Sequence, residues 1–182
     1  VLFVKDGETT CFAFVEELME RFAAMEQGPL KPSKPAVYHP AMTLKRKATE
    51  QNHLLLTFPS ISDTDSRRFP MQLLSSILGG GMSSRLFQEV RERQGLCYNV
   101  YTYGSGYQET GTFSIYAALN KETEMQALSA IRQVVEQFTQ DGVTEQELNR
   151  VRELAKANVL MGLESTTARM NSMARAALRG EK

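Results

Sequence analysis

Apolar residues recur at spacings of three and four along six stretches of the chain, and this spacing predicts amphipathic helices. Gly28 and Pro29 end the first helix, and Thr144 with Glu147 forms a Ser/Thr-x-x-Glu capping pattern at the start of the fifth. Pro70 fits its helix only in the first turn, where a missing N–H costs little. The predicted helices are 10–27, about 69–78, from Ser83 or Ser84 to Gly95, 123–140, 144–163 and one that starts at Thr166 or Thr167.

Short apolar or alternating runs between these helices predict strands. Residues 54–58 are mostly apolar, which suits a strand with little exposure to solvent. In the run 96–104, strict alternation places Tyr98 with Val100 on one face and Cys97 on the other. The predicted strands are 1–4, 43–48, 53–58, 96–104 and 111–119.

The order of these elements predicts the fold class. From residue 43 onward it is β-β-α-α-β-β-α-α-α, which is typical of an α+β, two-layer sandwich: a mostly antiparallel sheet with helices packed on one face. Residues 28–40 hold four of the six prolines, so we interpret them as a stiff linker rather than a surface loop. This divides the chain into 1–27, the end of a preceding α/β unit, the linker 28–40, and a main domain 41–182.

The two ends of the sequence suggest a fragment. The chain begins inside the apolar run 1–4, and it stops just past Gly180 with no closing strand. We therefore expect a longer parent protein, in which a signal peptide would not be visible here.

Composition narrows the class of protein. The chain has 182 residues, is 42% hydrophobic and 23% charged, and carries 21 basic and 21 acidic residues. This is an ordinary globular mixture without the basic surplus of a nucleic-acid-binding surface. No apolar run approaches the length that crosses a bilayer. Cys11 and Cys97 are isolated, which argues against a disulfide framework and favours a reduced cytosolic setting.

The stretch from Leu78 to Tyr98 holds the most unusual local features. Three consecutive glycines stop a helix, and their entropic cost suggests a gain from positive φ angles or a close backbone approach. Gly95 is predicted to be a left-handed helix terminator. Arg91 and Tyr98 then flank one helix-to-strand turn, where a guanidinium and a phenol would form a pair of hydrogen-bond donors.

Other candidate chemistry is weak. His39 and His53 are the only histidines and lie far apart in the sequence, whereas catalytic zinc needs about three protein ligands. No sequence feature brings Cys97 and His53 together as a nucleophile and base, so a structural cysteine is favoured. The glycine loop ends in Gly-Met-Ser-Ser-Arg, without the lysine of a phosphate-binding loop, so it is interpreted as a tightly packed loop or one along a substrate path.

Two interpretations of Arg91 and Tyr98 follow from their spacing. The structural one gives Arg91 a surface salt bridge and Tyr98 a hydrogen bond in the core. The functional one has both donate to a carbonyl oxygen that gains charge during peptide cleavage, where each preorganised donor contributes about 2.7–4 kcal/mol. Spacing alone does not separate them.

The sequence of this stretch, Leu-Gly-Gly-Gly-Met-Ser-Ser-Arg-Leu-Phe-Gln-Glu-Val-Arg-Glu-Arg-Gln-Gly-Leu-Cys-Tyr, resembles a signature of the pitrilysin-type (M16) zinc peptidases, which include the mitochondrial processing peptidase. The similarity extends through 50–60, 112–119 and 143–150 and covers nearly the whole chain. The chain looks most like the bacterial, processing-peptidase-like branch.

The resemblance implies a LuxS/MPP-like metallohydrolase fold, built from homologous α/β units that enclose a chamber for peptides. The preceding unit, ending at residue 27, would carry an inverted His-x-x-Glu-His zinc motif and a further Glu ligand. Residues 41–182 would be the C-terminal, substrate-binding domain, in which Arg91 and Tyr98 match the family's substrate-contacting pair. The predicted substrate-path loop consists of Gly79, Gly80, Gly81, Ser83 and Ser84.

The zinc motif itself is absent from this chain, so the resemblance implies no metal or cofactor here and zinc in the missing unit. The parent would be a zinc metalloendopeptidase of the bacterial cytoplasm, and this chain alone would cleave nothing. Its partners would be a peptide or unfolded polypeptide substrate and a metal-bearing N-terminal unit or subunit, in a homo- or heterodimer without nucleic acid or membrane. The alternatives are a non-catalytic structural or assembly subunit of the same family and a phosphate-ligand binding module.

Overall fold

The structure, a computed structural model, describes residues 10–26, 28 and 36–178. The chain divides into two compact units, one of residues 35–164 and one of residues 1–34 with 165–182. The predicted strand 1–4 and linker residues 29–35 lie outside the described residues.

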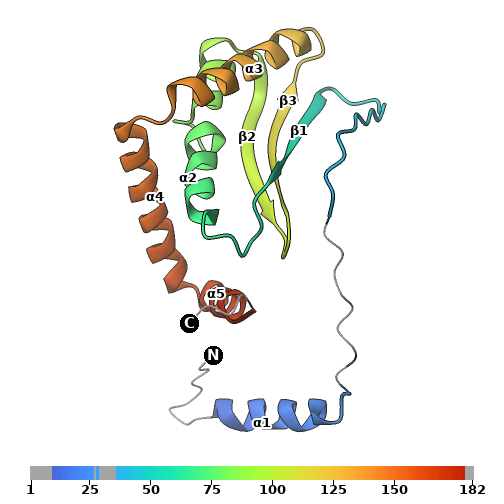
Figure 1. The fold of residues 1–182 in the computed structure, drawn as a ribbon, viewed down its shortest axis with the longest axis vertical. Coiled ribbons are helices and arrows are strands. Elements are labelled where there is room, and N and C mark those ends of the chain that lie inside the picture. The colour runs from blue at the N-terminus through green and yellow to red at the C-terminus, as the bar shows by residue number, and fades with distance from the viewer. Residues whose placement is uncertain (1–9, 27, 29–35, 179–182) are drawn as a thin grey trace. The chain divides into compact units, whose positions relative to one another are not determined.

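The larger unit is built on a three-stranded antiparallel sheet (Figure 1). Its strands are β1 (Asn52–Ser60), β2 (Cys97–Gly106) and β3 (Gly111–Leu119), in the spatial order β1-β3-β2. The sequence predicts all three strands to within two residues at each end, because their apolar or alternating runs are bounded by turn residues.

The helices α2 (Arg68–Gly79), η1 (Phe87–Arg93) and α3 (Glu124–Asp141) share one hydrophobic core with the inward residues of the sheet. A fourth helix, α4 (Glu145–Glu164), packs against α2. These layers confirm the predicted α+β sandwich. The largest fully buried side chains are Ile77, Leu86, Val90, Val100, Ile115, Leu119 and Ile131.

The opposite face of the sheet carries a group of partly exposed aromatic side chains. Leu55 of β1 and Tyr101 of β2 both lie opposite Tyr116 of β3, so the three form one row across the strands. The rings of Tyr101 and Tyr116 lie 4.8 Å apart, and His53 Nδ1 lies 2.7 Å from the Tyr116 hydroxyl. The Tyr116 hydroxyl therefore forms a hydrogen bond with one ring nitrogen of His53.

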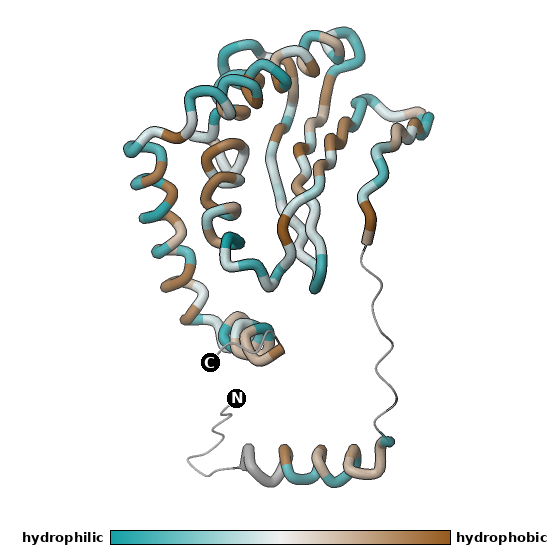
Figure 2. Tube along the Cα trace, viewed as in Figure 1, coloured by the Kyte–Doolittle hydropathy of each residue, from teal (hydrophilic) through white to brown (hydrophobic). Residues whose placement is uncertain are grey.

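The smaller unit contributes two described helices, α1 (Thr10–Ala23) and α5 (Thr166–Leu178). Both match predicted helices, and both expose apolar side chains, for example Phe22 on α1 and Met173 on α5. In the larger unit, hydrophobic and hydrophilic residues are interspersed along α4 (Figure 2). Val159 and Leu160 of this helix are exposed. No helix in the described ranges is long and apolar enough to cross a membrane.

The predicted strand 43–48 is wrong. These residues have no regular secondary structure and are exposed. A strand is stable only when its N–H and C=O groups pair with a neighbour. Within the described residues, β1 pairs with β3 alone, so no second strand lies along its other edge.

The three consecutive glycines differ in their surroundings, and none has a positive φ angle. A Cβ atom on Gly79 would lie 2.6 Å from Cγ2 and 2.7 Å from the backbone N of Thr102 on β2. A Cβ on Gly80 would lie 2.5 Å from Ser76 Cα, whereas one on Gly81 would meet nothing within 4 Å. The close approach of α2 to β2 therefore explains why position 79 is glycine. This is one of the two reasons that the sequence suggested for the glycines; the other was a positive φ angle.

We expect Gly79→Ala to destabilise the protein by about 1–3 kcal/mol, because the added methyl group would overlap the backbone of β2. Gly81→Ala is the matched control, and its free energy of unfolding should stay within about 0.5 kcal/mol of the parent value. Urea denaturation measures both. Equal losses in the two variants would contradict the packing role of Gly79.

Candidate functional site

The helix that carries Arg91 is a π-helix, not the α-helix expected from the sequence. Leu86, Phe87 and Val90 are buried along one side, as their spacing predicts. Gly95 ends the helix with φ 63°, which confirms the predicted left-handed terminator. Short π-helical segments often lie at functional sites.

Hydrogen bonds close the turn after η1. The Leu96 N–H donates to the Val90 carbonyl at 2.9 Å, and the Gly95 N–H donates to the Arg91 carbonyl at 3.1 Å. Leu96 is buried, so it folds back on the helix as predicted. The backbone of Arg91 is therefore fixed at the junction of helix and strand.

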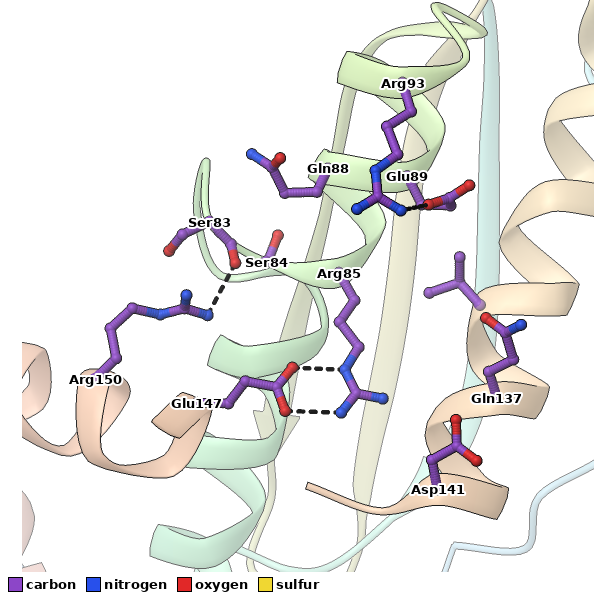
Figure 3. Close-up of a pocket in the computed structure, with 11 residues that line it drawn as sticks. Ser83, Ser84, Arg85, Gln88, Glu89, Arg93, Gln137, Asp141, Glu147 and Arg150 are labelled. Atoms are coloured by element: carbon purple, nitrogen blue, oxygen red, sulfur yellow. Dashed lines mark hydrogen bonds and ion pairs between the residues drawn. The ribbon is translucent and has the colours of Figure 1, made fainter. Parts of the chain in front are cut away.

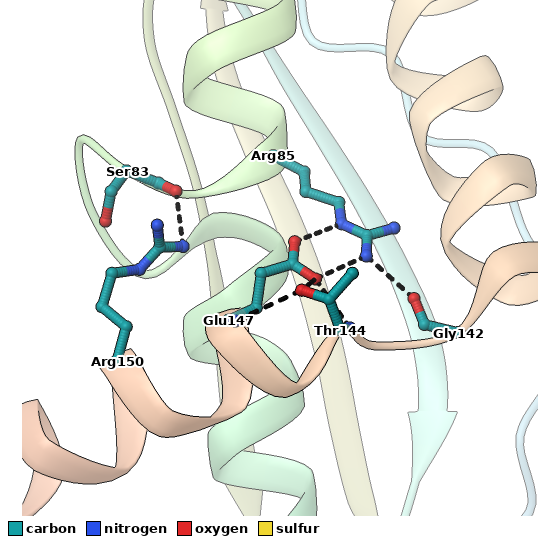
Figure 4. A network of polar contacts seen from close by, with 6 residues as sticks. All are labelled: Ser83, Arg85, Gly142, Thr144, Glu147 and Arg150. Carbon is teal, nitrogen blue, oxygen red and sulfur yellow. Dashed lines mark hydrogen bonds and ion pairs between the residues drawn. The ribbon is translucent and has the colours of Figure 1, made fainter.

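The glycine loop, residues 79–84, is held in place by hydrogen bonds that its backbone carbonyl groups accept. Gln88 Nε2 donates to the Met82 carbonyl at 2.7 Å, and Arg150 of α4 donates to the Ser83 carbonyl at 2.9 Å (Figure 4). The Ser84 hydroxyl donates to the Gly81 carbonyl at 2.6 Å. Ser84 takes the predicted cap position, because its carbonyl accepts from the Gln88 N–H at 3.0 Å, but its side chain closes the loop instead of bonding to the helix.

Arg91 lies in the last turn of η1 with its side chain exposed. Its guanidinium carbon sits 4.6 Å from the centroid of the Phe87 ring, which is within cation–π distance. Within the described part of the chain no carboxylate forms an ion pair with Arg91, whereas Arg93 pairs with Glu89 at 2.8 Å.

Tyr98 is the extra residue of a β-bulge at the start of β2. Cys97 lies opposite Leu119 and Asn99 lies opposite Ala118, so the register shifts by one residue between them. Bulges redirect side chains and are common beside active sites. The Tyr98 residue is 58% exposed.

The bulge changes which residues share a face of β2. Cys97 and Val100 are both buried, although strict alternation places them on opposite faces. Tyr98, predicted on the face of Val100, is exposed instead. The predicted sheet faces of Cys97 and Tyr98 are therefore wrong, because strict alternation holds only where strand pairing continues without a bulge.

Arg91 and Tyr98 thus flank one ordered turn, and both are open to solvent. The structural interpretation required a salt bridge for Arg91 and a core hydrogen bond for Tyr98. The described residues supply neither partner. What remains is a pair of exposed hydrogen-bond donors on a fixed backbone.

A polar pocket of about 270 Å³ lies between the loop before η1, η1 itself, α3 and α4, and neither Arg91 nor Tyr98 lines it (Figure 3). Its lining includes Arg85, Arg93 and Arg150. Each of the three guanidinium groups already donates to an acceptor within the protein. Arg85 and Arg93 are thus paired with carboxylates, whereas Arg150 donates only to the neutral Ser83 carbonyl. Two of the three charges are therefore already neutralised, which gives the phosphate-binding hypothesis little support.

An ion pair with two hydrogen bonds joins Arg85 to Glu147 in the pocket lining (Figure 4). Arg85 Nε and one terminal nitrogen donate to the two carboxylate oxygens at 2.6 and 2.7 Å, and the side chains are only 22% and 16% exposed. Glu147 also accepts from the Thr144 N–H at 2.9 Å, and the Glu147 N–H donates back to Thr144 Oγ1 at 3.2 Å. This confirms the predicted capping box.

These contacts shift the ionisation of both partners. Hydrogen bonding to Arg85 is the main cause that lowers the pKa of Glu147 from 4.5 to about 2. The same contact holds the pKa of Arg85 above its usual range. The carboxylate therefore stays charged at neutral pH and ties the start of α4 to the segment before η1.

Metal-ligand chemistry is not built into the described residues. No group of three or more His, Cys, Asp or Glu side chains there is placed to hold a metal ion. His53 contacts Tyr116, and burial raises the pKa of the Cys97 thiol, although the charge of Arg91 opposes that rise. The described side chains therefore do not fit a catalytic zinc site.

The fold is that of solved protease structures. A protease from Helicobacter pylori superposes with a TM-score of 0.76 at 17% identity, over 94% of this chain and 43% of that one. The peptidase M16 inactive domain from Pseudomonas fluorescens superposes with a TM-score of 0.57 at 33% identity, over 61% of this chain and 27% of that one.

The chain belongs to the peptidase M16 family: residues 8–154 match the domain described as the peptidase M16 inactive domain. An uncharacterized zinc protease of Streptomyces coelicolor is 40% identical over 132 residues, which are 72% of this chain and 29% of that relative. The predicted family is thereby confirmed. The chain spans less than a third of that relative's length.

Proposed function

We propose that this chain is the substrate-binding, non-metal part of an M16-type zinc metalloendopeptidase. The observation that carries the proposal is the exposed donor pair of Arg91 and Tyr98 at one ordered turn. Family membership supports the reaction class, and the related zinc protease supports the metal.

The chemistry follows from the two side chains. A guanidinium stays charged at all relevant pH values, and a phenol carries an O–H donor. Both can donate to the carbonyl oxygen of a bound peptide, which gains negative charge as the peptide bond is attacked. The Arg91 carbonyl accepts from the Gly95 N–H, and Tyr98 follows in the bulge at the start of β2, so both donors stand at one helix-to-strand junction.

Zinc, bound in another unit, would supply Lewis-acid chemistry to the same reaction. The residues of this chain would bind and orient the peptide. The glycine loop, with Met82 exposed and its carbonyls bonded, would line the path of the substrate. We place the complete protein in the bacterial cytoplasm, as a homo- or heterodimer with a zinc-bearing N-terminal unit or subunit.

A reconstitution experiment tests this proposal. The chain alone, a zinc-bearing M16 unit alone, and the two joined in one protein are each assayed with a quenched fluorescent peptide, and their zinc content is measured. We expect cleavage only from the joined protein, with zinc bound by the other unit. Stoichiometric, tight zinc on this chain alone would contradict the proposal.

The alternative, a non-catalytic structural or assembly subunit, gives a different result in the same experiment. A joined protein that holds zinc, binds peptide substrates poorly and cleaves none would favour that alternative. Added phosphate or nucleotide should leave the thermal stability of the chain unchanged, since a phosphate-binding module would be stabilised by its ligand.

A further inference from the structure

We propose that Phe87 is a positioning residue for Arg91: its buried ring supports the guanidinium so that the N–H donors point toward the substrate. This inference rests on the proposed function, because it assigns a role to Phe87 in the same reaction. It concerns a residue that touches Arg91 and not the substrate.

The geometry of η1 brings the two side chains together. Phe87 and Arg91 are four residues apart on the π-helix, and the guanidinium carbon lies 4.6 Å from the ring centroid. Phe87 is only 8% exposed, so the core holds the ring in place. An arginine side chain has many rotamers in water, and contact with a fixed ring reduces them.

A comparison within the protein shows what distinguishes this contact. Arg85 also lies over a ring, with its guanidinium carbon 4.9 Å from the centroid of Phe138. However, Arg85 gives its N–H donors to Glu147 and to the Gly142 carbonyl. That contact is structural.

Arg91 contacts a ring in the same way, but its N–H groups meet no acceptor in the part of the chain that the structure describes. Within the described residues no hydrogen bond or ion pair uses its guanidinium. A ring face orients a cation without accepting its N–H groups as a carboxylate would. Phe87 therefore fixes Arg91 while leaving the donors available to a peptide carbonyl.

The test uses the complete protein, in which this chain acts with its zinc-bearing unit. Phe87→Leu removes the ring and keeps an apolar side chain, and Phe87→Tyr keeps the ring. We expect Phe87→Leu to lower kcat for a reporter peptide about 3- to 10-fold with KM unchanged. Phe87→Tyr should keep most of the parent kcat, because it keeps the ring. Phe138→Leu is the matched control and should leave kcat unchanged.

A double-mutant cycle separates positioning from a general loss of structure. In the Arg91→Ala background, Phe87→Leu should have no further effect on kcat. An equal fold-loss in both backgrounds would overturn the positioning role. Full kcat in both the Arg91→Ala and the Tyr98→Phe variants would overturn the proposed function itself. Phe87→Met replaces Phe87→Leu if the latter does not fold.

Discussion

Replacing Arg91 by Ala, or Tyr98 by Phe, is expected to lower kcat of the complete enzyme by about 100- to 1000-fold, since removing one preorganised donor costs about 2.7–4 kcal/mol. The loss should fall on kcat more than on KM, because the substrate carbonyl gains its charge only in the transition state. Steady-state kinetics with a reporter peptide measures both constants. Bound zinc, measured on the same samples, should stay at the parent level.

Two nearby residues provide controls for this prediction. Arg93 lies in the same turn of η1, but its guanidinium is paired with Glu89. Tyr103 lies on the same strand as Tyr98, away from the bulge. Arg93→Ala and Tyr103→Phe should therefore keep kcat within a few-fold of the parent. Full turnover in both the Arg91 and Tyr98 variants would remove the proposed role of the pair.

Glu147→Ala is expected to cost about 3 kcal/mol of stability, the largest loss we predict for any single change. The substitution leaves the mostly buried Arg85 guanidinium without its carboxylate and opens the capping box of α4. The melting temperature should fall by roughly 6–12 °C. Glu136→Ala is the control. The side chains of Glu136 and its partner Arg132 are 53% and 79% exposed, so this ion pair contributes at most about 1 kcal/mol to stability.

The same pair predicts how stability depends on pH. Because the pKa of Glu147 falls from 4.5 to about 2 on folding, the unfolded chain binds more protons between these values. The stabilisation is therefore complete above about pH 4.5 and is lost as the pH falls toward 2. Glu147→Gln should remove this part of the acid dependence of the unfolding free energy. An unchanged acid slope in that variant would contradict the assignment.

Local chemistry made several elements predictable from the sequence. The capping box at Thr144 and Glu147 needs only residues three apart, and the structure forms both of its hydrogen bonds. The helix terminator at Gly95 also depends on local sequence, because a backbone conformation with φ 63° strongly favours glycine. The buried side of η1 followed from the spacing of Leu86 and Val90 alone.

The errors arose where the structure depends on distant parts of the chain. Whether 43–48 becomes a strand is decided by a neighbour along β1, which no local pattern supplies. The bulge at Tyr98 is set by the register with β3, and it reversed the expected facing of Cys97. The stacking of Arg91 on Phe87 had no sequence signal beyond a spacing of four, which many unrelated pairs share.

The most direct test of the account is a crystal structure of the complete protein with an uncleaved peptide bound, in an inactive variant of the zinc-bearing unit. We predict that the guanidinium of Arg91 and the hydroxyl of Tyr98 both lie within about 3 Å of one peptide carbonyl oxygen. A bound peptide whose scissile carbonyl faces the zinc unit, with Arg91 and Tyr98 both pointing to solvent, would contradict the central claim.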